Sequence, residues 1–239
     1  MTKHASSALV LLVASGFALV APADARAALV DIQFGSTGPS ASTQFSGAAM
    51  TGATGDQWNY FQSASRTSSL TDTSGAASGI SVTYAAQGTY GVVPSDSGFY
   101  GTSYAALMQA FLYTSGSISI TLQGLAPGQA FGLYIYGQSD QNSGAYGGTV
   151  TVNGATQTAL QSPYSTFVNN GNYLLFQGTA DTAGMISIND AVAAGRSQTM
   201  VNGIQLATGM QTVPEPVSLP LFGIGLAALS LLRQRRHAA

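Results

Sequence analysis

The chain has 239 residues, and only 7% of them are charged, whereas an ordinary soluble domain carries about 25%. Its formal net charge is −2, its hydrophobic share is 45%, and it contains no cysteine. These values exclude a disordered polar chain, a disulfide scaffold, an iron–sulfur cluster, a thiol nucleophile and a zinc site with cysteine ligands.

The first 27 residues have the pattern of a secretory signal peptide. Lys3 gives a positive start, an apolar run follows over residues 8–20, and small residues stand at Ala25 and Ala27. This arrangement predicts export through the Sec translocon and cleavage by signal peptidase after Ala27. Cleavage after Ala25 and a buried N-terminal helix are the alternatives.

The body of the chain, residues 28–212, is acidic and lacks most catalytic side chains. It has seven aspartates and two arginines, a net charge of −5, and no His, Cys, Lys or Glu. A Ser-His-Asp triad, a Cys-His pair, a Schiff-base lysine and a zinc site with histidine ligands are therefore excluded. Two arginines cannot form a phosphate-binding stripe, which excludes nucleic acid as a partner.

One familiar enzymatic route remains for the body, a pair of aspartates that cleaves a glycosidic bond. Aspartates in surroundings rich in Gly and Ser are more often turn or cap residues. We therefore expect a protein that is not an enzyme, with an aspartate-dependent glycan-cleaving enzyme as an alternative.

The body is predicted to consist of strands. Residues 117–122 and 148–152 alternate polar and apolar side chains, and Asn153-Gly154 predicts a hairpin that continues to residue 160. The aromatic and apolar run 130–136 is typical of a central strand. Six further strands are expected at residues 29–34, 80–85, 107–113, 173–177, 185–188 and 204–207. About nine or ten short strands with almost no helical periodicity favour an antiparallel β-sandwich or jelly roll over residues 28–208.

Trp58 is the only tryptophan of the chain. Together with Tyr60 and Phe61 it could form a platform that stacks on a sugar ring, with Asp56 or Asn59 binding hydroxyl groups. The alternative is that a single tryptophan in a sandwich fills the interior.

The segment 90–104 is long, rich in glycine and breaks the strand pattern. Tyr90, Phe99, Tyr100 and Tyr104 crowd into it, and Asp96 offers a hydrogen-bond acceptor. Because long loops often carry function, this is the preferred ligand-binding loop. The alternative is a covering loop whose aromatic rings pack on one sheet.

A second polar segment, residues 139–146, follows the expected central strand and contains Asp140 and Tyr146. It could line the same site as residues 90–104 if both segments lie at one end of the sandwich. A solvated connection is an equally good interpretation.

No cofactor is expected, and structural calcium is left open. Calcium needs several oxygen ligands that converge, to which Asp31, Asp72, Asp181 and Asp190 could contribute. No D-x-D-x-D-G spacing appears, so no metal site is predicted.

The C-terminal segment has three parts. Val213, Pro214, Glu215 and Pro216 end a linker over residues 209–216, and an uncharged stretch of 16 residues follows at 217–232. This stretch is slightly shorter than the roughly 20 residues that cross a bilayer. The positive-inside rule then keeps the basic end, residues 233–239, in the cytoplasm through its three arginines, Arg233, Arg235 and Arg236.

This order of V-P-E-P, apolar helix and arginine-rich end resembles the PEP-CTERM sorting signal. The resemblance implies export by a Gram-negative bacterium that makes extracellular polysaccharide, and processing by the membrane-embedded exosortase. It also implies removal of the helix and delivery of the protein from the inner membrane to the cell surface or extracellular matrix. Pro220 within the helix departs from a regular span. The alternative is a simple membrane anchor.

The body is also similar to the galactose-binding-like jelly rolls that precede such signals. The similarity lies in residues 124–128, 134–137, 151–154 and 201–206. Together the features predict a non-enzymatic surface or matrix protein that contacts extracellular polysaccharide. A purely structural, self-associating matrix protein is the alternative.

Overall fold

The computed structural model describes residues 28–37, 40–140, 145–161 and 164–209. The expected signal peptide, PEP motif, sorting helix and basic C-terminal end lie outside these residues. In the part of the chain that is described, we find no helix with the length and hydropathy that a membrane crossing requires.

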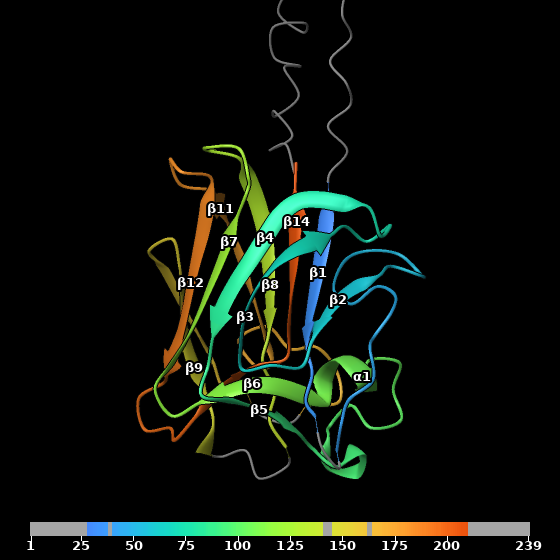
Figure 1. The fold of residues 1–239 in the computed structure, drawn as a ribbon. Helices are drawn as coiled ribbons and strands as arrows, with labels where there is room; N and C mark the ends of the chain where they lie inside the picture. The colour runs from blue at the N-terminus through green and yellow to red at the C-terminus, as the bar shows by residue number, and fades with distance from the viewer. Residues whose placement is uncertain (1–27, 38–39, 141–144, 162–163, 210–239) are drawn as a thin grey trace, which may run out of the picture.

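Fourteen strands form three sheets in the described residues (Figure 1). The first sheet has the order β11 (Tyr173–Thr179), β8 (Ala130–Tyr136), β14 (Gly203–Thr208), β1 (Leu29–Phe34) and β2 (Trp58–Phe61). The second has the order β10 (Ala155–Ala159), β9 (Gly148–Val152), β12 (Met185–Val192), β7 (Ser117–Gln123), β4 (Ala77–Ala85) and β3 (Ser65–Thr71). The third has the order β13 (Thr199–Val201), β6 (Ala110–Thr114) and β5 (Gly88–Gly91).

The two large sheets pack face to face, which makes the body a β-sandwich as the sequence predicts. Val30 and Ile32 of β1 lie in the same buried cluster as Ile120 and Leu122 of β7, and all four are at most 1% exposed. Alternating burial along β7 and β4 is the consequence, because one face of each strand contacts the core and the other contacts solvent.

Several strands are confirmed at the bounds expected for them. β1, β8 and β9 coincide with the predicted segments, and β10 ends one residue earlier than predicted. The Asn153-Gly154 hairpin is also confirmed, with φ angles of 45° and 90° at the two turn residues. Positive φ at both positions is the geometry that the Asn-Gly pair favours.

The predicted strand 107–113 is wrong at its start. Leu107 and Met108 belong to the short helix α1 (Ala105–Met108), and the strand β6 begins at Ala110. A short apolar run does not distinguish a buried strand from a buried helical turn, which is the physical reason for the error. A 3₁₀ turn, η1 (Pro94–Asp96), precedes α1 in the chain.

Four strands were not expected, and one pair is not antiparallel. β2, β5 and β13 have only three or four residues, and β3 is an exposed edge strand rich in Ser and Thr, so none has a clear alternating pattern. β1 and β2 run parallel. A parallel pair needs a long crossover connection, which residues 35–57 provide.

The outer face of the first sheet is covered by a second buried cluster. This cluster consists of Phe45, Trp58, Phe99, Leu107, Met108 and Tyr136. Its residues come from the crossover, from the segment before α1, from α1 and from the sheet itself, so the crossover and α1 pack on the same face.

The small third sheet lies at one end of the sandwich, and the ends of the described chain lie at the other (Figure 1). β5 and β6 cross below the large sheets in this view, while β1 starts and β14 finishes at the top. The Thr208 N–H donates to the Ala28 carbonyl at 2.9 Å, so the two chain ends are adjacent.

Candidate functional site

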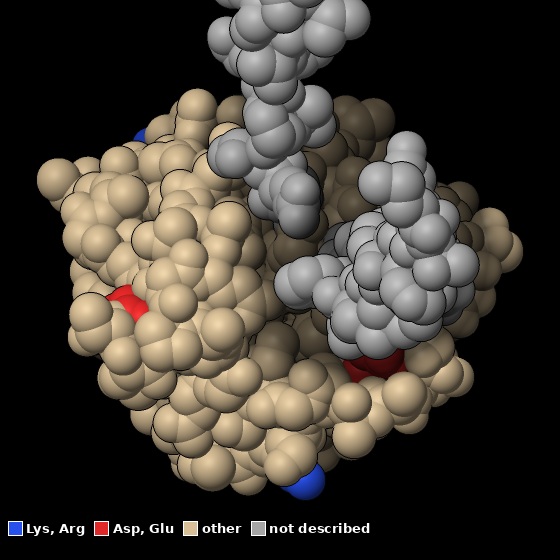
Figure 2. All heavy atoms as spheres, turned by 90° about the horizontal axis from the view of Figure 1, so that it is seen from above, with Lys and Arg blue, Asp and Glu red and all other residues tan. Residues whose placement is uncertain are grey.

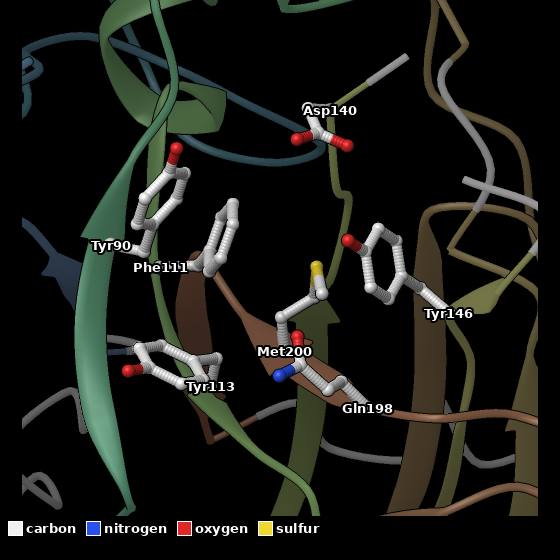
Figure 3. A pocket seen from close by; sticks show the side chains of 7 residues that line it. All are labelled: Tyr90, Phe111, Tyr113, Asp140, Tyr146, Gln198 and Met200. Carbon is white, nitrogen blue, oxygen red and sulfur yellow. The ribbon is translucent and has the colours of Figure 1, made fainter. Parts of the chain in front are cut away.

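The third sheet forms one wall of a hollow of about 270 Å³ (Figure 3). Its lining residues are Tyr90, Phe111, Tyr113, Asp140, Tyr146, Gln198 and Met200. In Figure 3 the rings of Tyr90 and Phe111 stand on one side, the ring of Tyr146 stands on the other, and Met200 lies between them.

Strand pairing fixes the positions of most of these side chains. Tyr90 of β5 is paired with Phe111 of β6, and Tyr113 of β6 is paired with Met200 of β13. An isolated bridge joins Tyr146 to Gln198. Side chains held by sheet registers need little ordering on binding, which reduces the entropic cost of a ligand contact.

The hollow has a buried base and an exposed rim. Phe111 is 5% exposed and Met200 is 1% exposed, and both belong to a small hydrophobic cluster with Val92. Tyr90 is 51% exposed, and its ring lies 5.8 Å from that of Phe111. The packed Phe111 therefore supports a tyrosine ring that is open to solvent on its other side.

The polar groups of the hollow are uncharged or acidic. Burial raises the pKa of the Tyr146 phenol, and the Asp140 carboxylate and the Tyr90 phenol raise it further. Tyr146 therefore stays protonated at neutral pH and can donate a hydrogen bond, while Asp140 accepts. Among the described lining residues, Asp140 is the single carboxyl.

Three of the predicted site residues meet in this hollow. Tyr90 begins the expected ligand loop, and Asp140 and Tyr146 belong to the second polar segment. Residues of the two segments therefore line one hollow, and ligand binding there stays a prediction.

Five other predicted residues are placed away from the hollow. Trp58 is 2% exposed and donates from its Nε1 to the Gly47 carbonyl, and Phe99 is fully buried. The sugar-stacking hypothesis for Trp58 is wrong, because its ring is buried, as the core-packing alternative stated. The ligand-binding role expected of Phe99 is wrong too, because its ring packs in the same buried cluster, as the covering-loop alternative stated. The Tyr104 ring packs 4.8 Å from that of Phe167. Asp96 and Tyr100 are exposed and do not line the hollow.

Four lining residues were missed by the sequence reasoning. Phe111, Tyr113, Gln198 and Met200 lie on β6, on β13 or directly before it. The period-two alternation of Phe111 and Tyr113 was a usable signal, because both rings lie on the same face of one strand. Nothing in the sequence indicates that β13 pairs with β6.

The aspartates considered for calcium have other roles or stand singly. Asp72 accepts from the backbone N–H groups of Ser74 and Ala76, and Asp181 accepts from those of Ala183 and Met185. These are the turn roles given as an alternative. Over the described ranges, no three acidic or histidine side chains come together.

The described surface carries few charges. On the face shown in Figure 2, acidic and basic atoms form isolated patches among uncharged residues. Arg66 and Arg196 are the only basic residues of the body, and the Arg66 guanidinium lies 5.0 Å from the centre of the Phe61 ring.

Comparison with known proteins gives distant structural likenesses only. No family model matches the chain, and no curated protein matches it. A ruminal GH26 endo-β-1,4-mannanase shares 15% identity over 44% of this chain and 20% of its own, with a TM-score of 0.31. The complex of the plant peptide RALF23 with FER and LLG2 contains a chain with 13% identity over 79% of this chain and 42% of its own, with a TM-score of 0.41.

A further likeness is to a family 35 carbohydrate-binding module from Clostridium thermocellum. It shares 16% identity over 38% of this chain and 71% of the module, with a TM-score of 0.26. The chain thus spans less than half the length of the first two proteins. The sandwich itself is established by the strand pairings described above.

Proposed function

We propose that this protein is a non-enzymatic, exported surface or matrix protein whose sandwich binds a neutral extracellular polysaccharide in the Tyr90 hollow. The observation that carries the proposal is a solvent-open tyrosine ring backed by a packed phenylalanine and surrounded by hydroxyl, amide and carboxylate groups. Small-molecule sites combine aromatic walls with a few polar groups in this way.

The chemistry of the lining fits a sugar better than other small ligands. Aromatic faces stack on the apolar C–H faces of pyranose rings, and Tyr90 offers such a face at the rim. Asp140, Tyr146 and Gln198 supply acceptors and donors for ring hydroxyls. Glycoside cleavage needs two carboxyls, and the described lining supplies one, which supports binding without turnover.

The charge of the body favours a neutral chain over an acidic one. Residues 28–212 contain seven aspartates and two arginines, and the balance stays acidic when Asp31 and Asp190, whose pKa is raised by burial, are left out. A polymer of uronate or sulfated sugars would meet a field of its own sign, which lowers its encounter rate and its affinity.

The position of the third sheet supports display on a surface. This sheet, which carries Tyr90, Phe111, Tyr113 and Met200 of the lining, lies at the end of the sandwich opposite to the start of β1 and the finish of β14 (Figure 1). A body tethered through the segment after Thr208 would therefore present the hollow away from the tether. Export by signal peptidase and the Sec translocon, the jelly-roll class, and exosortase processing at the PEP motif belong to the same proposal.

Affinity electrophoresis tests the proposed binding. The full chain is run through gels that contain soluble β-glucan, mannan or galactan, beside a gel without polysaccharide. Retardation in at least one gel is expected, and Tyr90→Ala should weaken it about tenfold, as removal of a central aromatic contact does. Tyr100→Ala is the matched control, because Tyr100 is 64% exposed and does not line the hollow. Unchanged mobility in every gel would overturn the proposal.

Self-association is the second candidate function, and an edge strand favours it. β10 (Ala155–Ala159) ends the six-stranded sheet and has neither a charge nor a proline, the features that usually block edge pairing. Light scattering at increasing protein concentration, with no sugar present, would show growing particles if this function dominates. A constant monomer mass would reject it.

A further inference from the structure

Tyr90 borders a second hollow on the surface of the sandwich. This hollow also measures about 270 Å³, and its other lining residues are Ser36, Thr37, Ser40, Thr89 and Gly91. Tyr90 is the one residue common to the linings of the two hollows. The aromatic hollow and the hollow lined by hydroxyl-bearing residues are therefore adjacent at Tyr90.

The second hollow has a firm base. A Cβ at Gly91 would lie 2.0 Å from the Ser40 carbonyl oxygen and 2.3 Å from Ser36 Oγ, so β5 packs directly against Ser36 and Ser40. The Ser36 hydroxyl donates to the Ser40 carbonyl at 3.3 Å. The hydroxyls of Thr37 and Thr89 add donors and acceptors at the rim of this hollow.

The sizes of the hollows point to a chain and not to a single sugar. Each hollow lies just below the roughly 300 Å³ at which typical ligand pockets begin. Together the two hollows enter the usual range. A single ring would occupy one hollow and leave the second without a function.

We infer that the two hollows, which meet at Tyr90, hold consecutive units of one uncharged sugar chain. The inference rests on the proposed polysaccharide binding and adds that the ligand is recognised as an oligosaccharide. The aromatic hollow supplies stacking, and the hydroxyl-lined hollow supplies hydrogen bonds to the next unit. Because the sugar units are linked, binding of one unit in the first hollow holds the next unit at high effective concentration beside the second hollow.

Titration calorimetry with oligosaccharides of one to four units tests this inference on the full chain. The cello-, manno- or galacto-oligosaccharide series is chosen from the polymer that retards the protein most. Affinity should rise about tenfold or more when the chain becomes long enough to cross Tyr90. Thr89→Val removes one hydroxyl from the second hollow and keeps the β-branched shape that a strand favours.

Thr89→Val should lower affinity for the longer oligosaccharides and leave that for the monosaccharide unchanged. Thr156→Val on β10 is the matched control, and equal urea unfolding midpoints show that both variants fold. Affinity that is independent of chain length, or a Thr89→Val variant that behaves like the unaltered chain, overturns the inference while the proposed function stands. Absence of binding to every oligosaccharide and polymer overturns both.

Discussion

Two carboxyl groups are buried in the sandwich without a charged partner. Asp31 Oδ1 accepts from Gln205 Nε2 at 3.1 Å, and Asp190 Oδ2 accepts from the Thr199 hydroxyl at 2.8 Å. The second oxygen of each carboxyl has no hydrogen-bond partner. Burial raises the pKa of Asp31 to about 8 and that of Asp190 to about 7, against the hydrogen bonds, which lower both values.

This burial predicts a stability that falls as the pH rises. The ordinary pKa of Asp31 is 3.8, so its protonated form is favoured in the folded state. The contribution of Asp31 to the free energy of unfolding is fully present below about pH 4 and is lost as the pH rises to about 8. Asp31→Asn should make the free energy of unfolding fall less steeply with pH, by at most about 1.4 kcal/mol for each pH unit. Urea unfolding between about pH 4 and 9 measures this slope.

The control for this prediction is Asp72, a carboxyl whose pKa is lowered in the folded state and not raised. Hydrogen bonds, first that from the Ser74 side chain, lower the pKa of the exposed Asp72. Asp72→Asn should therefore leave the slope above about pH 5 unchanged. An Asp31→Asn variant with the slope of the unaltered protein would contradict the burial described here.

Position 148 has room only for glycine, because a larger residue would clash with the Asp190 side chain. A Cβ at this position would lie 2.2 Å from Asp190 Oδ1 and 2.4 Å from Thr199 Oγ1, and neither group can move freely in the core. Gly148→Ala should lower the free energy of unfolding by about 1–3 kcal/mol through overpacking. Gly116→Ala is the control, because its nearest neighbour would be 3.7 Å away. Urea unfolding measures both, and equal losses would contradict the close contact.

At the scale of elements, the segment that covers the first sheet depends on buried glutamines. The Phe45 N–H donates to Gln33 Oε1 at 2.7 Å, and Gln33 Nε2 donates to the carbonyls of Thr43 and Ala106 at 3.0 and 2.8 Å. Gln205 Oε1 accepts from the Met50 N–H at 3.1 Å. Side chains of the sheet thus replace the strand pairing that the covering segment lacks.

Gln33→Leu tests this role of the glutamine. It would leave the buried Phe45 N–H without a partner and remove the Gln33 donor from the carbonyls of Thr43 and Ala106. The unpaired N–H costs about 1–3 kcal/mol, so we expect a loss of stability of about this size and faster hydrogen exchange at residues 43–51. Gln123→Leu on the exposed face of β7 is the control. Slow exchange at residues 43–51 in Gln33→Leu would contradict the tethering role.

The strands with a clear pattern were predictable from sequence, and the edges and the end sheet were not. Alternation in β7 and the Asn153-Gly154 turn reflect forces within a few residues. β5 and β13 have no such pattern, because their place depends on pairing with β6 from distant parts of the chain. The sequence indicated Tyr90 and Tyr146 as candidate site residues, because each is an aromatic residue in a polar or glycine-rich segment. For Trp58 both a sugar-stacking and a core position stayed open, because composition does not show which side of a strand is covered.

In the whole molecule, the ends of the described chain lie at one end of the sandwich, and the third sheet, which lines the hollow, lies at the other. If exosortase removes the tail as proposed, mass spectrometry of the exported protein should detect peptides of the body and none beyond about residue 216, with the uncleaved precursor as control. A tail that stays intact in the surface form would contradict the sorting proposal and leave the hollow unaffected.

The central claim is that sugar chains bind beside Tyr90, and methionine methyl NMR tests it most directly. Met200 lies in the hollow, whereas Met108 is in the cluster below the crossover and Met185 begins β12. With ¹³C-methyl methionine in the full chain, the polysaccharide that retards the protein should shift the Met200 signal and leave Met108 and Met185 in place. A Met200 signal that does not move at saturating polysaccharide would contradict the account.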